Sequence, residues 1–196
     1  IHRRTAAEVL GIPFEEVTPE QRSHAKAVNF GIIYGISDFG LARQLGIPRK
    51  DAADYIKTYF ERYPHIHEFM NSMVEKARET GRAVTLFGRY RELPDINSKN
   101  FNRRSFAERT AMNTPIQGTA ADIMKMAMIE VYRRMKEGGY RSRVLLQVHD
   151  ELVAEVVKEE KEEIAALLKD AMESVVTLKV PLVADVNEGK NWAETK

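Results

Sequence analysis

Apolar and polar residues in the first half of the chain recur with the period of an α-helix. Thr18, Pro19 and Gln21 have the spacing of a helix start, in which Thr18 caps the helix, Pro19 takes its first position and Gln21 closes a capping box. We predict that this helix continues to Tyr34. Gly35 can then end it, because glycine has no Cβ to clash in the left-handed conformation that commonly follows a helix.

Two further amphipathic segments of the first half predict helices, Arg49–Arg62 and His65–Thr80. Pro64 is expected to stop the first of them and Gly81 the second. Residues 83–93 mix apolar and basic side chains around a glycine, a pattern that predicts a short hairpin or loop. The first half is therefore expected to be mostly helical.

The period changes in the second half of the chain. Helices are predicted for residues 102–113 and 119–137, and they are followed by two β-type runs, Val144–Val148 and Leu152–Val156. A hairpin of these two runs would carry three polar residues at its tip: His149, Asp150 and Glu151.

The last segments are predicted to be a charged helix from Lys158 to about Val175 and a short strand, Leu182–Val186. Helices followed by a small antiparallel sheet indicate an α+β fold. The 196 residues suffice for one core or for two small subdomains. No stretch approaches the ~18 apolar residues of a membrane span, so no membrane partner is expected.

Composition excludes one class of chemistry and localises the charge. The chain has no cysteine, which excludes disulfides and thiolate catalysis and is compatible with a reducing cytoplasm. The net charge is only +1, but residues 1–110 contain 18 basic and 14 acidic residues, whereas residues 111–196 contain 12 and 15. Residues 81–109 alone contain 7 basic and 3 acidic residues, which suits either a phosphate backbone or a solvated surface.

One stripe of the first long helix combines cations and aromatic rings. Arg22, Lys26, Phe30 and Tyr34 are four residues apart, so each is turned only about 40° from the one before. Arg22 and Lys26 could bind neighbouring phosphates of a triphosphate, and the two rings could stack beside a base or sugar. Taken singly, such cations are usually solvated and such aromatic residues usually belong to a core.

Acidic residues at the tip of the predicted hairpin suggest a metal site. Asp150 and Glu151 would place charge beside two apolar strands, which is costly unless a cation compensates it. Mg²⁺ is the natural candidate, because phosphoryl transfer with two metal ions needs carboxylates to hold them. The alternative is an exposed turn, where Asp and Glu are common.

A third row of polar residues, Arg109, Asn113 and Gln117, also has a spacing of four. Such a row suits hydrogen bonds to minor-groove edges, where all base pairs present similar acceptors. The alternative is a set of ordinary surface polar residues.

These three motifs together closely resemble family A DNA polymerases, the bacterial DNA polymerase I group. The segment RSHAKAVNFGIIYG at 22–35 resembles the nucleotide-binding helix of that family, ERTAMNTPIQGTAAD at 108–122 its palm helix, and VHDE at 148–151 its carboxylate motif. The resemblance covers essentially the whole chain.

The resemblance implies a role for each matched residue. It implies dNTP binding by His2, Arg22, Lys26, Phe30 and Tyr34, with Lys26 also in a catalytic role at the leaving pyrophosphate. It implies catalysis and Mg²⁺ binding by Asp150 and Glu151. It implies contacts with primer-template DNA by Tyr34, Gly35, Arg109, Asn113, Gln117 and His149.

The same resemblance implies a division into helical fingers at residues 1–99 and the C-terminal part of a palm at residues 100–196. The family has a second metal-binding aspartate, in a segment resembling Asp-Tyr-Ser-Gln-Ile-Glu, which is absent from this sequence. The chain is therefore expected to begin mid-protein, to need an upstream thumb and palm segment as partner, and to be inactive alone. A bacterial-type cytoplasmic location is expected.

Two other functions are compatible with the sequence. Single-subunit RNA polymerases share the Lys and Tyr-Gly pattern of the helix, although Phe30 and Glu151 favour a DNA polymerase. A noncatalytic fragment that binds nucleotides or nucleic acid is the second alternative, and the missing aspartate supports it.

Overall fold

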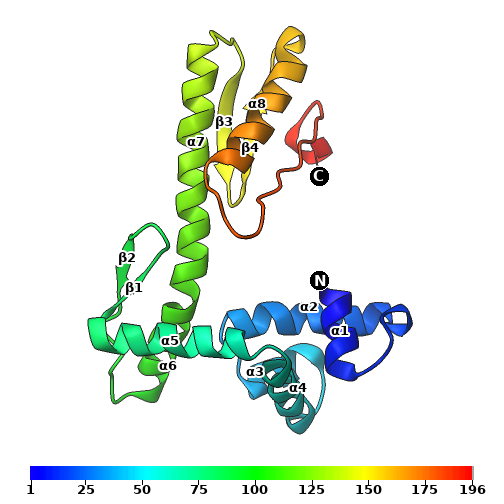
Figure 1. Cartoon of the computed structure of the whole chain (residues 1–196), viewed down its shortest axis with the longest axis vertical. Coiled ribbons are helices and arrows are strands. Elements are labelled where there is room, and N and C mark those ends of the chain that lie inside the picture. The colour runs from blue at the N-terminus through cyan, green and yellow to red at the C-terminus, as the bar shows by residue number, and fades with distance from the viewer. Residues whose placement is uncertain (196) are drawn as a thin grey trace. The chain divides into compact units, whose positions relative to one another are not determined.

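The computed structural model describes residues 1–195 and shows an α+β protein that divides into two compact units, Ile1–Ile116 and Gln117 onward. The first unit contains six α-helices, a 3₁₀ turn and a hairpin: α1 (His2–Leu10), η1 (Phe14–Glu16), α2 (Pro19–Ile33), α3 (Asp38–Leu45), α4 (Arg49–Arg62), α5 (Pro64–Thr80), β1 (Arg82–Val84), β2 (Tyr90–Glu92) and α6 (Phe101–Asn113) (Figure 1). The predicted helices at 49–62 and 65–80 and the hairpin at 83–93 are thereby confirmed.

Helix α2 begins where its sequence predicts. Gln21 N donates to Thr18 Oγ1 at 3.2 Å, and Thr18 N donates to Gln21 Oε1 at 2.9 Å, so both bonds of the capping box are present. At the other end Gly35 has φ +70°, the left-handed conformation that a glycine adopts without strain.

The largest core of the first unit lies between α2, α3 and α4. Val28 and Ile32 from α2 pack with Leu41, Ala52 and Tyr59, and all five are at most 3% exposed. A smaller core joins α1 to α2 through Ala6, Ala7, Val17 and Ala25. These contacts bury one side of α2, so the residues of its opposite side face outward.

The second unit consists of two helices and a hairpin. Its elements are α7 (Thr119–Glu137), β3 (Arg143–Val148), β4 (Glu151–Glu155), η3 (Lys158–Glu160), α8 (Lys161–Ser174) and η4 (Trp192–Thr195). Val131 and Met135 from α7 pack against Ile164 and Ala171 from α8, and residues of the hairpin cover this core (Figure 1). A π-helical turn, η2 (Thr114–Gly118), contains Pro115 and leads from α6 into α7.

Two sequence predictions about the second unit need correction. Glu151 is not in the hairpin tip, because it is the first residue of β4 and pairs with Val148; the tip is His149 and Asp150 alone. The strand predicted at Leu182–Val186 is wrong. Within the described residues this segment has no neighbouring strand, and Ala184 N donates instead to Glu173 Oε1 at 2.9 Å.

The predicted subdomain boundary at residue 99 stays a prediction, since the compact units describe packing and not function. None of the helices within residues 1–195 combines the length and the apolar character needed to cross a bilayer.

Candidate functional site

The outward side of α2 carries the predicted stripe. Arg22, Lys26, Phe30 and Tyr34 are all exposed, whereas Val28 is fully buried. Within residues 1–195, the side chains of Arg22 and Lys26 form no hydrogen bond or ion pair. Both cationic groups are therefore available to an anion.

Two aromatic rings continue the stripe toward the end of α2. The ring centroids of Phe30 and Tyr34 are 6.5 Å apart with an interplanar angle of 16°, and the side chains are 47% and 42% exposed. Exposed stacked rings offer an apolar face to a planar or sugar-like group. The stripe thus places an apolar surface beside two cations.

His2 of α1 lies against the same side of α2. Its ring centroid is 5.7 Å from that of Phe30, and its Nδ1 lies 2.9 Å from Asn29 Nδ2. Because the amide nitrogen is a donor, Nδ1 is the acceptor, and neutral His2 carries its proton on Nε2. Desolvation lowers the pKa of His2, and positive charges that include Arg22 and Lys26 lower it further.

Asn29 is the residue of this region that sequence reasoning missed. It is 9% exposed, and its Nδ2 contacts Thr5 Oγ1 at 3.1 Å as well as His2. A polar residue next to Val28 on the buried side of an amphipathic helix was the available signal, because buried amides are usually hydrogen-bonded.

The end of α2 packs closely on α6. A Cβ added to Gly35 would lie 2.6 Å from Met112 Cε and 2.9 Å from Arg109 Cγ. The structure therefore brings two predicted site residues together, Gly35 and Arg109, and Tyr34 precedes Gly35 in the chain. Arg109 itself donates from Nη1 to Ser105 Oγ at 2.9 Å.

The predicted polar row follows α6 into the π-helical turn. Arg109 and Asn113 are partly buried residues of α6, and Gln117 is an exposed residue of η2. Asn113 Oδ1 is buried and has no hydrogen-bond partner within residues 1–195. π-Helical turns occur frequently at functional sites, and a buried acceptor without a donor is uncommon in a folded protein.

Basic residues gather on the β1–β2 hairpin. Arg82, Arg89 and Arg91 are exposed, and the Arg82 guanidinium lies 4.7 Å from the centroid of the Tyr90 ring. This is the basic stretch found in the sequence, and its pairing of cations with an aromatic ring suits a nucleic-acid backbone and its bases.

The hairpin of the second unit presents the two predicted carboxylates differently. Asp150 is exposed and forms no hydrogen bond or ion pair within residues 1–195. Glu151 Oε1 accepts a hydrogen bond from Trp192 Nε1 at 2.7 Å. His149 has φ +53°, and Gln147 Nε2 donates to its carbonyl oxygen at 2.7 Å.

The carboxylates of residues 1–195 do not complete a metal site. Within residues 1–195, no three His, Cys, Asp or Glu side chains are placed to hold one ion together. Mg²⁺ takes about six oxygen ligands, so Asp150 fits it as one ligand among several.

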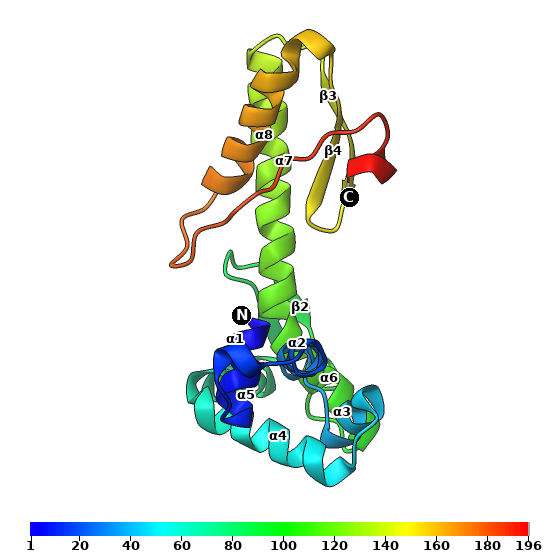
Figure 2. The ribbon, with the colours of Figure 1, turned by 90° about the vertical axis from the view of Figure 1, so that its right-hand side faces the viewer.

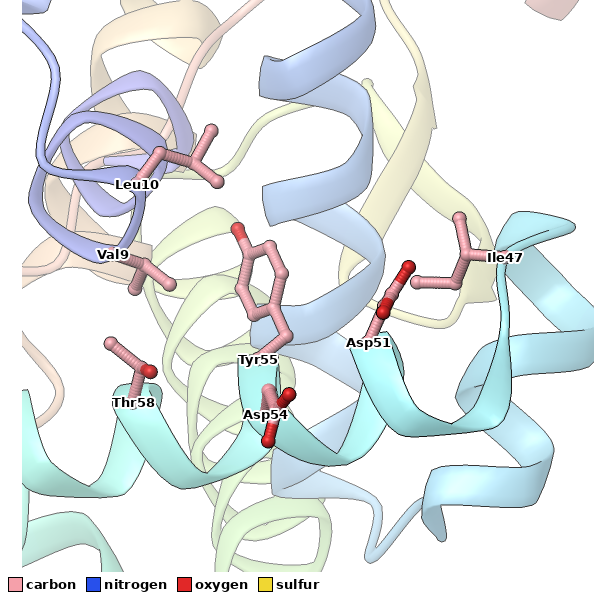
Figure 3. Close-up of a pocket in the computed structure, with 7 residues that line it drawn as sticks. All are labelled: Val9, Leu10, Ile47, Asp51, Asp54, Tyr55 and Thr58. Carbon is pink, nitrogen blue, oxygen red and sulfur yellow. The ribbon is translucent and has the colours of Figure 1, made fainter.

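A cavity of about 310 Å³ lies in the first unit, between α1 and α4, away from the predicted residues (Figure 3). Its lining consists of Val9, Leu10, Ile47, Asp51, Asp54, Tyr55 and Thr58. The Tyr55 hydroxyl is buried without a hydrogen-bond partner within residues 1–195, and burial raises its pKa to about 12. This cavity shares no residue with the stripe on α2.

Comparison with known sequences gives one family. DNA polymerase family A matches residues 1–194. DNA polymerase I of Caldicellulosiruptor bescii is 57% identical over 196 residues, and DNA polymerase I of Pseudomonas aeruginosa is 52% identical over 194 residues. These alignments cover 100% and 99% of this chain but 23% and 21% of the relatives, so the chain spans about a fifth of their length.

A solved structure gives the same result. The chain is similar to the POL domain of Pol1 from M. smegmatis, determined in complex with a DNA primer-template and dNTP. The TM-score is 0.94 at 42% sequence identity, and the match covers 99% of this chain and 34% of that one.

Proposed function

Because the chain belongs to DNA polymerase family A, we propose that it forms part of an enzyme that adds nucleotides from dNTPs to the 3′-hydroxyl of a primer, directed by a DNA template. The observation that carries this proposal is the exposed stripe of Arg22, Lys26, Phe30 and Tyr34 on one side of α2. The structural neighbour, solved with primer-template and dNTP, supports it.

In this proposal α2 binds the incoming dNTP. Arg22 offers a planar fork and Lys26 a compact charge, and both suit phosphate oxygens. Nε2–H of His2 donates to the same triphosphate, since Asn29 occupies Nδ1. The Phe30 ring packs on the sugar, Tyr34 stacks beside the template base, and Lys26 supplies a proton to the departing pyrophosphate.

The second unit supplies carboxylates in this proposal. Asp150 would give one ligand to a Mg²⁺ site and Glu151 a weaker contact through Oε2, and the other ligands would come from outside these residues. Bound Mg²⁺ would reduce the repulsion between the primer 3′-oxygen and the phosphate.

Primer-template DNA is the proposed nucleic-acid partner. Arg109, Asn113 and Gln117 would bind minor-groove edges, Tyr34 and His149 would contact the primer-template, with His149 near the primer terminus, and Gly35 would let the end of α2 pack on Arg109. We further propose that a thumb and palm segment is the protein partner, that this chain alone does not extend a primer, and that it acts in the bacterial cytoplasm, where bacterial DNA lies.

A binding fragment without catalysis is the second candidate. The observation in its favour is that the carboxylates of residues 1–195 do not complete a metal site. It predicts DNA binding that weakens with salt and no extension when the missing segment is added. An RNA polymerase would instead prefer ribonucleotides, which measurement of rNTP against dNTP incorporation tests.

The deciding experiment mixes this chain with a separately produced thumb and palm segment of the family and measures Mg²⁺-dependent primer extension. We expect extension that is lost in Asp150→Ala and retained in Asp185→Ala, a control in which another exposed aspartate of the second unit is removed. Extension at low dNTP should fall about tenfold or more in Lys26→Ala but not in Lys50→Ala, an exposed lysine of α4. If the two segments fold and associate but extend no primer, the binding fragment is the correct description.

A further inference from the structure

The only tryptophan of the chain is bonded to one of the two neighbouring carboxylates. Trp192 Nε1 donates to Glu151 Oε1 at 2.7 Å, across 41 positions of sequence. Both residues belong to the second unit, where η4 lies beside the β3–β4 hairpin (Figure 2). A hydrogen bond to a carboxylate is stronger than one between neutral groups.

Several contacts hold Trp192 in this place. The segment between α8 and η4 is fixed by the Glu173–Ala184 hydrogen bond and by an ion pair between Lys161 Nζ and Glu188 Oε2 at 2.5 Å. Glu194 then closes the turn, because its carboxylate accepts from Lys190 N at 2.9 Å and from Asn191 Nδ2 at 2.7 Å. The indole is therefore carried by a segment with its own fixed contacts.

Gly189 shows how tightly this turn is closed. An added Cβ at Gly189 would lie 2.6 Å from Glu194 Cβ. Real Cβ atoms do not approach so closely, so the backbone before Trp192 requires a glycine.

The indole contact restrains one side of the hairpin tip, and Gln147 restrains the other. Gln147 Nε2 bonds the carbonyl of His149, and Trp192 bonds the carboxylate of Glu151. Asp150 lies between these two anchored residues and has no partner of its own in the part of the chain that the structure describes. The two adjacent carboxylates thus differ, since one is held by the protein and the other is free.

We propose that Trp192 is a positioning residue for the acidic hairpin tip: by holding Glu151 it fixes the start of β4 and thereby the place of Asp150. This proposal rests on the proposed function, in which Asp150 is needed for nucleotidyl transfer. Supporting groups of this kind commonly change activity by about 10- to 100-fold when they are removed.

The anchoring can be tested without any activity. Because the chain has one tryptophan, its NMR spectrum contains one indole N–H resonance. We expect Glu151→Ala to move this resonance upfield and to speed its exchange with solvent. Glu162→Ala, an exposed carboxylate of α8, should leave it in place. Glu151→Gln retains an acceptor oxygen and should preserve most of the protection.

The positioning role is tested by a double-mutant cycle in reconstituted primer extension. Trp192→Phe keeps the ring and removes the N–H; we expect the single-turnover rate to fall about tenfold with the KM for dNTP unchanged, because α2 is untouched. In a Glu151→Ala background the same substitution should have no further effect.

Either of two results would overturn the proposal. One is an indole resonance that does not respond to Glu151→Ala, and the other is a Trp192→Phe defect of equal size in both backgrounds. Absence of extension in the unmodified protein would contradict the proposed function and with it the positioning role, whereas a shifted indole resonance would still establish the anchoring itself.

Discussion

At the scale of single residues, the protonation of the His2 ring depends on its contact with Asn29 and on the positive charges of α2. Asn29 Nδ2 can donate to His2 Nδ1 only while that nitrogen has no proton. Desolvation and the positive charges nearby also disfavour the imidazolium, so the pKa of His2 lies below its ordinary value of 6.5. Neutral His2 is the form that this environment stabilises.

The lowered pKa of His2 predicts how the stability of the folded chain depends on pH. Because the folded pKa is lowered, the contribution of His2 to stability is present above pH 6.5 and is lost as pH falls through the folded pKa. We expect urea unfolding of the wild type and His2→Gln to differ in their pH dependence only below about pH 6.5. Added triphosphate should raise the pKa of His2 in an NMR titration, because its negative charge favours the imidazolium. A histidine that titrates at 6.5 or above in the free chain would contradict this account.

Removing the Tyr55 hydroxyl is expected to lower the free energy of unfolding little or not at all, in contrast to removing the Tyr63 hydroxyl. Its hydroxyl is buried without a partner within residues 1–195, whereas the Tyr63 hydroxyl bonds Glu8 Oε2. We expect Tyr55→Phe to leave the free energy of unfolding unchanged or to raise it by up to about 1 kcal/mol. Tyr63→Phe should lower it by about 1–3 kcal/mol. Equal losses in the two variants, measured by chemical denaturation, would show that Tyr55 has a partner after all.

At the scale of elements, the end of α2 is fixed twice, by its own backbone and by α6. Gly35 has φ +70°, and an added Cβ would crowd Met112 and Arg109. Gly46 at the end of α3 has φ +67°, but an added Cβ would meet nothing within 4 Å. Comparing alanine at Gly35 with alanine at Gly46 therefore separates the free-energy cost of a left-handed backbone from the cost of steric contact with Met112 and Arg109.

We expect Gly46→Ala to destabilise the protein by about 1 kcal/mol, the backbone cost alone. Gly35→Ala should cost about 1–2 kcal/mol more, because Met112 and Arg109 must also move. Denaturant unfolding measures both, and an NMR comparison should show shifted resonances around Arg109 only in Gly35→Ala. If the two alanine variants were equally stable, the packing of α2 on α6 would not depend on this glycine.

Local chemistry decides which elements could be predicted from sequence. The start of α2 was predictable because Thr18, Pro19 and Gln21 satisfy its first N–H groups within four residues. Helix α3 went unpredicted although Ser37 Oγ accepts from Gly40 N at 3.1 Å, because its eight residues are too few for a clear period. The strand predicted at 182–186 failed for a different reason, since strand formation requires a neighbour that propensity alone cannot supply.

The same distinction applies to the candidate site. The stripe on α2 follows from helical periodicity, so its four outward residues could be found from spacing alone. Contacts between distant segments could not, and these include Asn29 with His2, Gly35 with Arg109 and Trp192 with Glu151. Each of them depends on packing that no local pattern encodes.

At the scale of the whole molecule, the two compact units have separate cores. The buried clusters of the first unit are built from residues up to Ala111, and that of the second is built around Val131, Met135, Ile164 and Ala171. Within residues 1–195 none of these clusters contains buried residues of both units. Loss of packing in one core should therefore reach the other weakly.

Ile164→Ala tests this separation directly. Ile164 is fully buried, and truncating such a side chain costs about 2–5 kcal/mol. We expect hydrogen exchange to accelerate in α7, α8 and the β3–β4 hairpin, while the amides of α2 and α4 keep their protection. Val28→Ala, in the core of the first unit, should give the reverse pattern. If either substitution lowered protection equally in both units, they would unfold as one cooperative body, and a defect in the second core would then also weaken the proposed triphosphate site on α2.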